Sequence, residues 1–372
     1  MFVRAVDSSV CEISAGSSRF ELRVEAPAPP SNHNWVFPAA LPAAMATGSA
    51  LEIEPSVSPR MLQAAPEIQD ILSSWTSGNL KRVEVRAHSD AGSVSRAAGV
   101  GVFFSGGVDS LYSLLKNRES VSHLILVQGF DMKLAQNELF SLAQASAQRV
   151  AAEFGKELIV VRTNVRDFSD RYAAWGMYHG AALAMVGHTL SSVVGKCIIG
   201  SSHPYADLHP WGSHPQLDPL WSSESVSFSH DGVEANRLQK LALIASNDVA
   251  LKALRVCWES DREYNCGRCE KCIRTMTALL ALGKLGECPT LPHRVAPGLI
   301  RRIQLDDDSA LHWRELENES GLPREIRSAV SRILNNYRLG LTPVTGVRSG
   351  LKRARFYLQN AARLTKAVQR DA

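Results

Sequence analysis

The chain has 372 residues, of which 45% are hydrophobic and 21% charged, a balance typical of a globular protein with about two to three domains. Its formal net charge of +4 is too small to indicate a nucleic-acid-binding protein. The first residues lack a secretory signal and no segment is a long uninterrupted apolar run, so we expect a cytoplasmic protein without membrane contact. Four of the seven cysteines fall between residues 257 and 272, which favours a metal site in a reducing compartment over disulfides.

The first part of the chain, residues 1–95, is predicted to form a small α+β unit. Polar and apolar residues alternate in RFELRVEAP (19–27) and LKRVEVRA (80–87), as in strands. Residues 58–75 have helical periodicity behind a Ser-Pro start. The repeated prolines of 27–42 predict a loop or extended chain.

A regular alternation follows a linker at 90–99 and defines the main domain, residues 96–290. Short apolar runs predict strands, and the segments between them predict helices. The strands are expected at 100–105, 123–130, 157–164 and 196–202, and the helices at 108–118, 134–154 and 180–195. This alternation predicts an α/β fold with a doubly wound parallel sheet, which binds ligands at the carboxyl ends of its strands. Residues 291–372 are expected to form a basic helical extension.

The turn from the first of these strands into the first helix has the sequence SGGVDS, residues 105–110. The glycines allow a sharp turn, and backbone N–H groups and serine hydroxyls then meet a helix N-terminus, which favours an anion. The turn is therefore a candidate phosphate site. It lacks the Gly-Lys-Ser/Thr of a Walker loop. The alternative is an ordinary Gly-Gly turn in which Asp109 only starts the helix.

A second motif has the spacing C-x8-C-x2-C-x2-C. Its members are Cys257, Cys266, Cys269 and Cys272. Four thiolates this close in sequence can surround one tetrahedral ion, so we predict a structural zinc site. An iron–sulfur cluster is the competing metal site, and four unligated cysteines are the remaining alternative.

The segment GSSHPYADLHPWGSHPQLDPLWSSE, residues 200–224, follows the fourth expected strand. Long loops in compact domains are usually functional, and these side chains offer hydrogen bonds and stacking to a planar heterocycle. The candidate substrate-binding residues are Ser202, His203, Tyr205, Asp207, Trp211, His214 and Asp218. The three histidines leave a second metal site as an alternative, although their spacing matches no familiar ligand pattern.

SGGVDS resembles the pyrophosphate-binding loop of the PP-loop ATP pyrophosphatases, the adenine nucleotide alpha hydrolase superfamily. The resemblance implies that ATP is cut between its α and β phosphates and that a substrate oxygen is adenylated. It implies that the loop residues bind pyrophosphate, that Asp109 helps to place Mg²⁺, and that Ser105, Asp109 and Ser110 are catalytic. The loop residues are Ser105, Gly106, Gly107, Val108, Asp109 and Ser110. The end of the second strand would face adenosine with Gln128, Gly129 and Phe130.

Together with the cysteine motif, the loop resembles the 7-cyano-7-deazaguanine synthase family over residues 99–285. Enzymes of that family activate a deazaguanine carboxylate with ATP and use ammonia to form an amide and then a nitrile. The resemblance therefore implies an AMP-forming ligase with ATP, Mg²⁺ and zinc, whose partners are a small-molecule substrate and ammonia or an amine donor. Val108 and Leu111 depart from the glutamine and threonine typical of that family, which indicates a divergent paralogue with a changed substrate.

Two weaker features leave their roles open. A helix is expected to restart within 230–244, where charged residues recur at helical spacing. These residues, Glu234, Arg237 and Lys240, would form either a solvated helix face or a contact to the ATP phosphates. A second stripe, of aromatic residues just before the third helix, leaves a contact to the ATP phosphates open, although such a stripe is more often part of the core. Its members are Trp175, Tyr178 and His179.

The last part of the chain is basic. After Gly340, only Asp371 opposes a set of cations, which are Arg348, Lys352, Arg353, Arg355, Arg363, Lys366 and Arg370. A solvated helical tail is favoured, and nucleic-acid binding through it stays open. The alternative functions are a tRNA-thiolating sulfur transferase and a non-catalytic nucleotide-binding subunit of a defence or biosynthetic operon. A homodimer is also left open.

Overall fold

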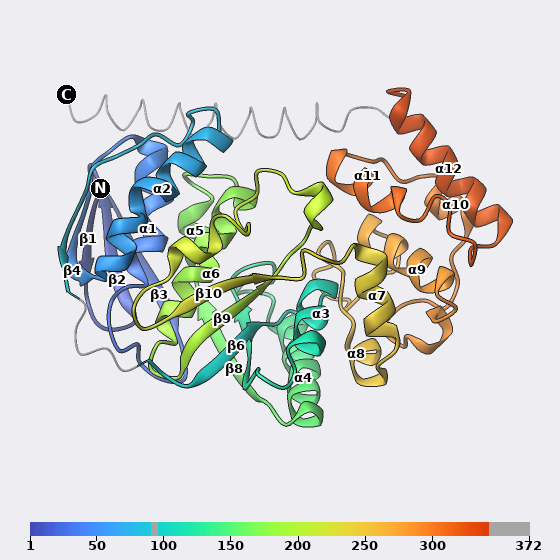
Figure 1. Cartoon of the computed structure of the whole chain (residues 1–372), viewed down its shortest axis with the longest axis horizontal. Helices are drawn as coiled ribbons and strands as arrows, with labels where there is room; N and C mark the ends of the chain where they lie inside the picture. Colours follow the sequence, from blue (N-terminus) through green and yellow to red (C-terminus); the bar gives the residue numbers. More distant parts are fainter. Residues whose placement is uncertain (91–95, 342–372) are drawn as a thin grey trace. The chain divides into compact units, whose positions relative to one another are not determined.

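A computed structural model describes residues 1–90 and 96–341 of the chain. The chain divides into two compact units, Met1–Ala235 and Asn236–Ala372 (Figure 1). The boundaries expected at 95/96 and 290/291 do not coincide with this division. The N-terminal strands continue the sheet of the α/β core, and the cysteine motif belongs to the second unit. The expected linker lies partly outside the described residues.

The first unit is an α/β fold on a large, mostly parallel sheet with the strand order β10-β9-β6-β7-β8-β3-β2-β1-β4-β5. Its strands are β1 (Phe2–Ala5), β2 (Val10–Ala15), β3 (Ser18–Glu25), β4 (Leu51–Val57), β5 (Val85–Ser89), β6 (Gly99–Phe103), β7 (His123–Gln128), β8 (Glu157–Thr163), β9 (Val194–Gly200) and β10 (Ser227–Asp231). Neighbours from β10 to β8 are all parallel, as the alternation predicts. The sequence did not indicate β10, because SFSHD contains no apolar run.

Helices connect these strands. They are α1 (Val36–Thr47), α2 (Pro59–Trp75), α3 (Val108–Lys116), α4 (Asn137–Phe154), α5 (Val165–Ser169) and α6 (Trp175–Thr189), with short 3₁₀ turns η1 (Tyr205–Asp207) and η2 (Asp218–Trp221). The three helices expected between 108 and 195 are confirmed, although α6 spans Trp175–Thr189 rather than 180–195, and residues 194 and 195 begin β9. Right-handed crossovers carry α3 and α4 to one face of the sheet and α6 to the other, since the strand order reverses at β6.

Side chains of β10 confirm this arrangement. Asp231 accepts a hydrogen bond from Asn117 at the end of α3 and pairs with Lys116. Phe228 points to the opposite face, where its ring meets His188 of α6 with centroids 5.2 Å apart. The sheet is therefore covered on both faces at this edge.

The N-terminal strands extend the sheet instead of forming a separate unit. β3 pairs antiparallel with β8 through Val24 opposite Thr163 and Glu25 opposite Arg162. β2 and β1 follow antiparallel, and β4 and β5 add a parallel edge. Helix α2 begins behind Ser58, whose hydroxyl accepts a hydrogen bond from the Met61 N–H, as the Ser-Pro start predicts.

The expectation of a loop or extended chain over 27–42 was wrong for its second half, which belongs to α1. Pro38 lies in the first turn, where a missing N–H leaves no hydrogen bond unmade. Pro42 lies within the helix and removes one internal bond. Every residue from Val36 to Met45 is buried, so packing on all sides offsets the cost of that proline.

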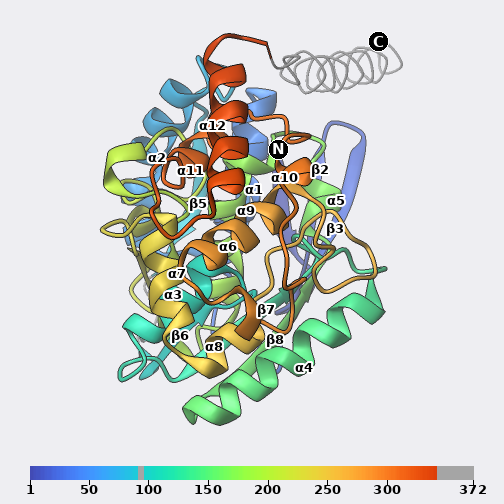
Figure 2. The same ribbon diagram turned by 90° about the vertical axis from the view of Figure 1, so that its right-hand side faces the viewer.

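The second unit is helical in its described part. Its helices are α7 (Arg237–Ala245), α8 (Asp248–Ala253), α9 (Glu270–Ala281), α10 (Pro297–Ile300), α11 (Asp307–Arg314) and α12 (Arg324–Arg338), with the 3₁₀ turn η3 (Leu285–Glu287). α12 packs against α10 and α11 with an apolar stripe that includes Ile326, Val330 and Ile333 (Figures 1 and 2). The expected helical extension is thus helical up to Arg338, while the basic residues from Arg348 onward lie outside the described residues.

Candidate functional site

The SGGVDS loop connects the buried strand β6 to helix α3. Gly106 has a φ of +74°, a conformation that side chains disfavour, and this turn leads the chain into the helix. Ser105 Oγ accepts a hydrogen bond from the Gly107 N–H, and Ser110 Oγ accepts one from the Ser105 N–H, each at 3.3 Å. Gly107 is the N-cap and provides no side-chain cap, so the first turn of α3 presents N–H groups suited to an anion.

The loop lies where the strand order reverses, the position at which open α/β sheets form a ligand crevice. β9 ends at Gly200, where a Cβ atom would lie 2.8 Å from the Asp109 carbonyl oxygen and 3.2 Å from Ser113 Oγ. Only glycine allows the end of β9 to approach α3 so closely. The segments that follow β6 and β9, expected to bind phosphate and substrate, therefore leave the sheet side by side.

A polar network joins α3 to the end of β10. Lys116 Nζ lies 2.9 Å from Asp231 Oδ1 and 2.5 Å from Glu234 Oε1, and Tyr112 donates a 2.8 Å hydrogen bond to Glu234. Burial, followed by that hydrogen bond, raises the pKa of Tyr112 to about 12. Glu234 precedes α7, so it does not belong to the expected helix face with Arg237 and Lys240.

The loop after β9 brings only some of its candidate residues together. His203, His209 and Trp211 form a ring cluster, with centroids 4.3 Å apart for the two histidines and 6.0 Å apart for His203 and Trp211. Tyr205 is 67% exposed, whereas His203 is buried. Ser202 and Asp207 are half-buried in the same stretch.

These rings continue into a longer row, which we call the aromatic wall. Its members are Phe130, Trp175, His179, Trp211, His203 and His209. Consecutive centroids lie 5.1 Å apart for Phe130 and Trp175, 6.3 Å for Trp175 and His179, and 5.5 Å for His179 and Trp211. The Arg166 guanidinium lies 4.3 Å from the Trp175 ring centroid. The wall thus joins the end of β7, the start of α6 and the loop after β9.

Of the three aromatic residues expected in the core on α6, only Tyr178 is fully buried there. Tyr178 is fully buried, and its hydroxyl donates to the Ala39 carbonyl. Trp175 and His179 are half-buried and belong to the aromatic wall. Burial lowers the pKa of His179, which favours its neutral form.

Glycines set the path of the loop across α6. A Cβ atom on Gly180 would lie 1.8 Å from the Gly212 carbonyl oxygen, and one on Gly176 would lie 3.0 Å from the Trp211 ring. The Gly212 N–H donates a 2.7 Å hydrogen bond to the Gly176 carbonyl. The backbone of residues 211–213 therefore packs closely on residues 175–180 of α6, and this contact holds Trp211 in place.

Asp218 and His214 face inward rather than toward a ligand. Asp218 is 0% exposed, and its Oδ2 accepts a 2.7 Å hydrogen bond from Ser213 and lies 2.7 Å from His230 Nδ1. Its Oδ1 accepts from the His214 N–H at 3.2 Å. The His214 ring packs edge-on against Trp75. The positions of these two residues favour supporting roles within the loop.

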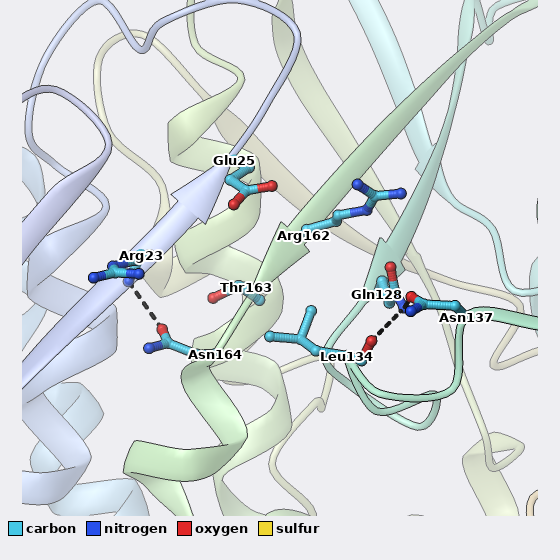
Figure 3. A pocket seen from close by; sticks show the side chains of 8 residues that line it. All are labelled: Arg23, Glu25, Gln128, Leu134, Asn137, Arg162, Thr163 and Asn164. Atoms are coloured by element: carbon cyan, nitrogen blue, oxygen red, sulfur yellow. Dashed lines mark hydrogen bonds between the residues drawn. The ribbon is translucent and has the colours of Figure 1, made fainter. Parts of the chain in front are cut away.

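A cavity of about 300 Å³ lies at the carboxyl ends of β7 and β8, beside the end of β3 (Figure 3). It is lined by Arg23, Glu25, Gln128, Leu134, Asn137, Arg162, Thr163 and Asn164. Gln128, expected to face adenosine, is 1% exposed and donates to the Leu134 carbonyl at 3.1 Å and to Asn137 Oδ1 at 3.3 Å. The charged lining suits a polar ligand.

Sequence reasoning missed most of this lining. Arg162 and Thr163 end β8 and Asn164 follows it, so the rule that ligands bind at carboxyl ends could have found them. The other two expected adenosine residues lie nearby in sequence. Gly129 has a φ of +105° and would place a Cβ atom 1.8 Å from the Thr163 carbonyl oxygen, whereas Phe130 joins the aromatic wall.

The four motif cysteines gather in the second unit, and their sulfur atoms all lie within 4.8 Å of one another. Cys266 and Cys272 Sγ are 3.9 Å apart, and Cys257 and Cys269 Sγ are 4.0 Å apart. Four sulfurs bound at about 2.3 Å to one tetrahedral ion would lie about 3.8 Å from one another. This buried group could hold a metal ion such as zinc. A cluster with four irons would separate the thiolates further.

Surrounding groups fix the cysteines. Gly267 has a φ of +67° and allows the tight turn after Cys266. Asn265 Oδ1 accepts from the Val256 and Cys257 N–H groups at 2.8 and 3.1 Å. Cys269 is the N-cap of α9, where the helix dipole stabilises thiolate. A hydrogen bond from the Cys272 side chain is the main cause that lowers the pKa of Cys269.

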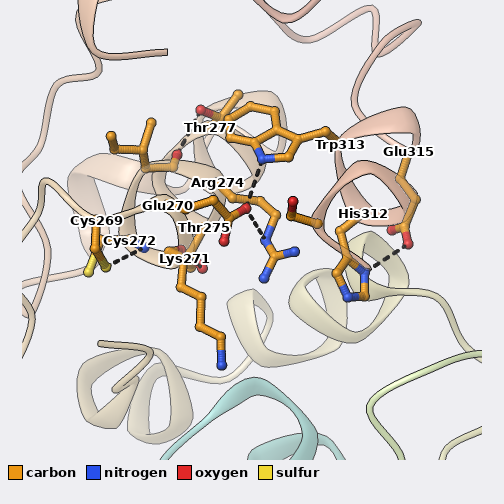
Figure 4. A network of polar contacts seen from close by, with 12 residues as sticks. Cys269, Glu270, Lys271, Cys272, Arg274, Thr275, Thr277, His312, Trp313 and Glu315 are labelled. Atoms are coloured by element: carbon orange, nitrogen blue, oxygen red, sulfur yellow. Dashed lines mark hydrogen bonds and ion pairs between the residues drawn. The ribbon is translucent and has the colours of Figure 1, made fainter. Parts of the chain in front are cut away.

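A polar network continues from the cysteines along α9 (Figure 4). Glu270 Oε1 accepts a 2.8 Å hydrogen bond from Trp313 Nε1 and lies 3.4 Å from Arg274 Nε. Burial raises the pKa of Glu270 and lowers that of Arg274. The hydrogen bond from Trp313 to Glu270 fastens α11 to α9 and so supports the helix that carries Cys272.

No protein-family model matches the chain, and neither a curated protein nor a solved structure matches it. Among the helices of the described residues, none is both long and apolar enough to cross a membrane.

Proposed function

We propose that the protein is an ATP-dependent enzyme that adenylates a carboxylate or carbonyl oxygen of a small planar heterocycle and releases pyrophosphate. A nitrogen nucleophile then displaces AMP. The observation that carries the proposal is the 105–110 loop, which joins the buried strand β6 to the N-terminus of α3 where the strand order reverses. A helix N-terminus without a side-chain cap, approached through a glycine turn, is a suitable cradle for pyrophosphate.

Each loop residue has a role in this proposal. The backbone N–H groups from Gly106 to Ser110 would bind the β and γ phosphates, and the Ser105 and Ser110 hydroxyls already order the loop. Asp109 is half-buried in the first turn of α3 and would help to hold Mg²⁺, which prefers carboxylate and phosphate oxygens. ATP supplies the adenylyl group that turns a poor leaving oxygen into AMP.

The aromatic wall supports a planar substrate. Trp211 is held by glycine contacts against α6, so its ring is positioned before a ligand arrives. A heterocycle could stack on such a ring, and the neighbouring histidines could hydrogen-bond its edge. The four-cysteine group would serve folding through a bound zinc ion, apart from the reaction.

The test is product analysis with ATP, Mg²⁺ and a panel of carboxylated heterocycles and amino acids. We expect AMP and pyrophosphate with at least one of them, whereas ADP and phosphate from the pure protein would overturn the proposal. Asp109→Asn should lower AMP release by about 100-fold or more. Asp167→Asn is the matched control, because Asp167 is an exposed acid in the first turn of α5.

The same assay separates the alternative functions. ATP binding without AMP release would favour a nucleotide-binding subunit. Two results together would favour the thiolating enzyme: the intact protein binds tRNA at physiological salt, and deletion of residues 345–372 abolishes both this binding and the activity. We expect instead that the deletion leaves AMP-forming turnover on a small molecule largely intact.

A further inference from the structure

A buried pair joins Asp218, a candidate residue of the loop after β9, to His230, which lies outside the residues assigned to the site. His230 Nδ1 in β10 is 2.7 Å from Asp218 Oδ2, and the two side chains are 3% and 0% exposed. Ser213 Oγ donates to the same Oδ2 at 2.7 Å and lies 3.4 Å from His230 Nδ1. A carboxylate that already accepts two bonds at one oxygen is held in place.

The pair determines which imidazole nitrogen carries the proton. Because Asp218 accepts at Nδ1, that nitrogen is the N–H donor and Nε2 keeps its lone pair. His230 Nε2 is buried and has no hydrogen-bond partner within the described chain. An unpartnered acceptor beside a buried carboxylate is expensive unless a ligand or substrate proton meets it.

His188 shows what a structural histidine looks like in the same unit. It is fully buried, and its Nε2 lies 2.8 Å from the Trp221 carbonyl oxygen rather than from a carboxylate. Its Nδ1 is also unpartnered, so an unpartnered nitrogen alone does not mark a functional site. The carboxylate is the difference, because it orients the His230 ring and fixes which nitrogen carries the proton.

The histidine lies at the edge of the sheet that holds the candidate site. His230 is paired with Ile199 of β9, and the next residue, Asp231, accepts a 2.7 Å hydrogen bond from the Ser201 N–H. One residue earlier, Gly200 contacts Asp109 of the phosphate loop. The backbone of His230 is thus one strand spacing, about 4.8 Å, from the strand end that touches α3. Its side chain points to the α6 face of the sheet, as that of Phe228 does, where the loop after β9 packs on Gly176.

Ser213 does not complete a hydrolase triad. In such a triad the serine hydroxyl bonds the nitrogen that is remote from the aspartate. Ser213 instead lies on the aspartate side of the ring, near Nδ1, and donates to Asp218. The arrangement therefore leaves His230 Nε2 for a proton that comes from a bound molecule.

We propose that His230 Nε2 accepts the proton of the nitrogen nucleophile, with Asp218 as its positioning residue. The inference rests on the proposed adenylating function and names a second step at the same site. As the nitrogen lone pair forms the C–N bond, one N–H proton moves to Nε2. The bond from the acyl carbon to the AMP oxygen breaks, AMP keeps the electron pair, and the imidazolium then loses its proton to water.

The experiment separates the two half-reactions with a deazaguanine carboxylate as the probe. ATP–pyrophosphate exchange reports adenylation, and amide formation with ammonia reports displacement. We expect His230→Gln to keep exchange within about 3-fold and to lose amide formation by about 100-fold or more, the usual value of a positioned base. Asp218→Asn should likewise keep ATP–pyrophosphate exchange and lose amide formation. Hydroxylamine, which is uncharged near neutral pH and needs less help from a base, should recover much of the loss.

The matched control is His188→Gln, which removes an equally buried histidine of the same unit and should leave the ratio of the two half-reactions unchanged. A parallel loss of exchange and amide formation in His230→Gln would overturn the inference while the proposed function stands. Absence of exchange in the intact protein with every carboxylate of the panel would overturn both. An independent readout is the ¹⁵N spectrum of the intact protein: His230 with its proton on Nε2 would contradict the proposal whatever the variants do.

Discussion

The cysteine site allows the sharpest test, through the change Cys269→Ser. Cys269 is the N-cap of α9 and accepts a hydrogen bond from the Cys272 N–H at 3.5 Å. Serine is among the best N-cap residues, so the replacement keeps the helix cap and removes only a thiolate. The effect should therefore come from the metal.

The magnitude follows from linkage between metal binding and folding. A metal present at about 1,000 times its dissociation constant stabilises the folded form by about 4 kcal/mol. The sulfur separations of 3.9 and 4.0 Å are already close to those around one ion, so little of this energy is spent on rearrangement. We expect Cys269→Ser to lose the metal and about 4 kcal/mol or more of local stability.

The assay combines metal analysis with hydrogen exchange of peptides from residues 254–281, which reports the second unit by itself. The control is Cys288→Ser, since Cys288 Sγ donates to the Leu251 carbonyl at 3.6 Å and serine can keep that bond. One zinc per chain in the control and none in Cys269→Ser is the expected result. A Cys269→Ser protein that keeps its zinc and its protection would refute the reasoning, and iron with acid-labile sulfide would exclude zinc.

Two other changes test the packing of the first unit. Gly200→Ala would place a Cβ atom 2.8 Å from the Asp109 carbonyl, so α3 must shift by about half an ångström. We expect the KM for ATP to rise about 10-fold, whereas Gly286→Ala, with nothing within 4 Å, should leave it unchanged. Burial lowers the pKa of His188 to about 4 from an ordinary 6.5. Between these values the unfolded chain binds more protons, so stability should fall by about 3 kcal/mol from pH 7 to 4, and urea titrations of His188→Gln should show a smaller fall.

The alternation of strands and helices after residue 99 was predictable because each element carries its own local signal. Buried parallel strands are continuous apolar runs, and the helices between them have their own periodicity. The pairing of β3 with β8 was not predictable, since it joins residues about 140 positions apart through only two residue pairs. The prediction for the segment that forms α1 was wrong for a related reason. Its prolines are local signals against a helix, but the burial that offsets their cost comes from tertiary packing.

The candidate site divides in the same way. The SGGVDS loop and the cysteine motif are short sequences whose spacing determines their geometry, so they could be proposed as candidate sites without a structure. His230 could not, because its chemistry depends on Asp218, which a loop of twelve positions separates from it. The strand that carries it is too polar to be recognised.

Contacts at the ends of β9 and β10 connect helix α3 to the strands that carry the other parts of the proposed site. Gly200 packs on the first turn of α3, and Asp231 joins β10 to the far end of the same helix through Lys116. Helix α3 is therefore held at both ends by the strands that carry the substrate loop and His230. A ligand that moves this loop must act on the helix whose N–H groups we propose to bind phosphate. Such coupling suits a reaction in which adenylation and displacement follow each other at one site, because each step positions groups needed for the next.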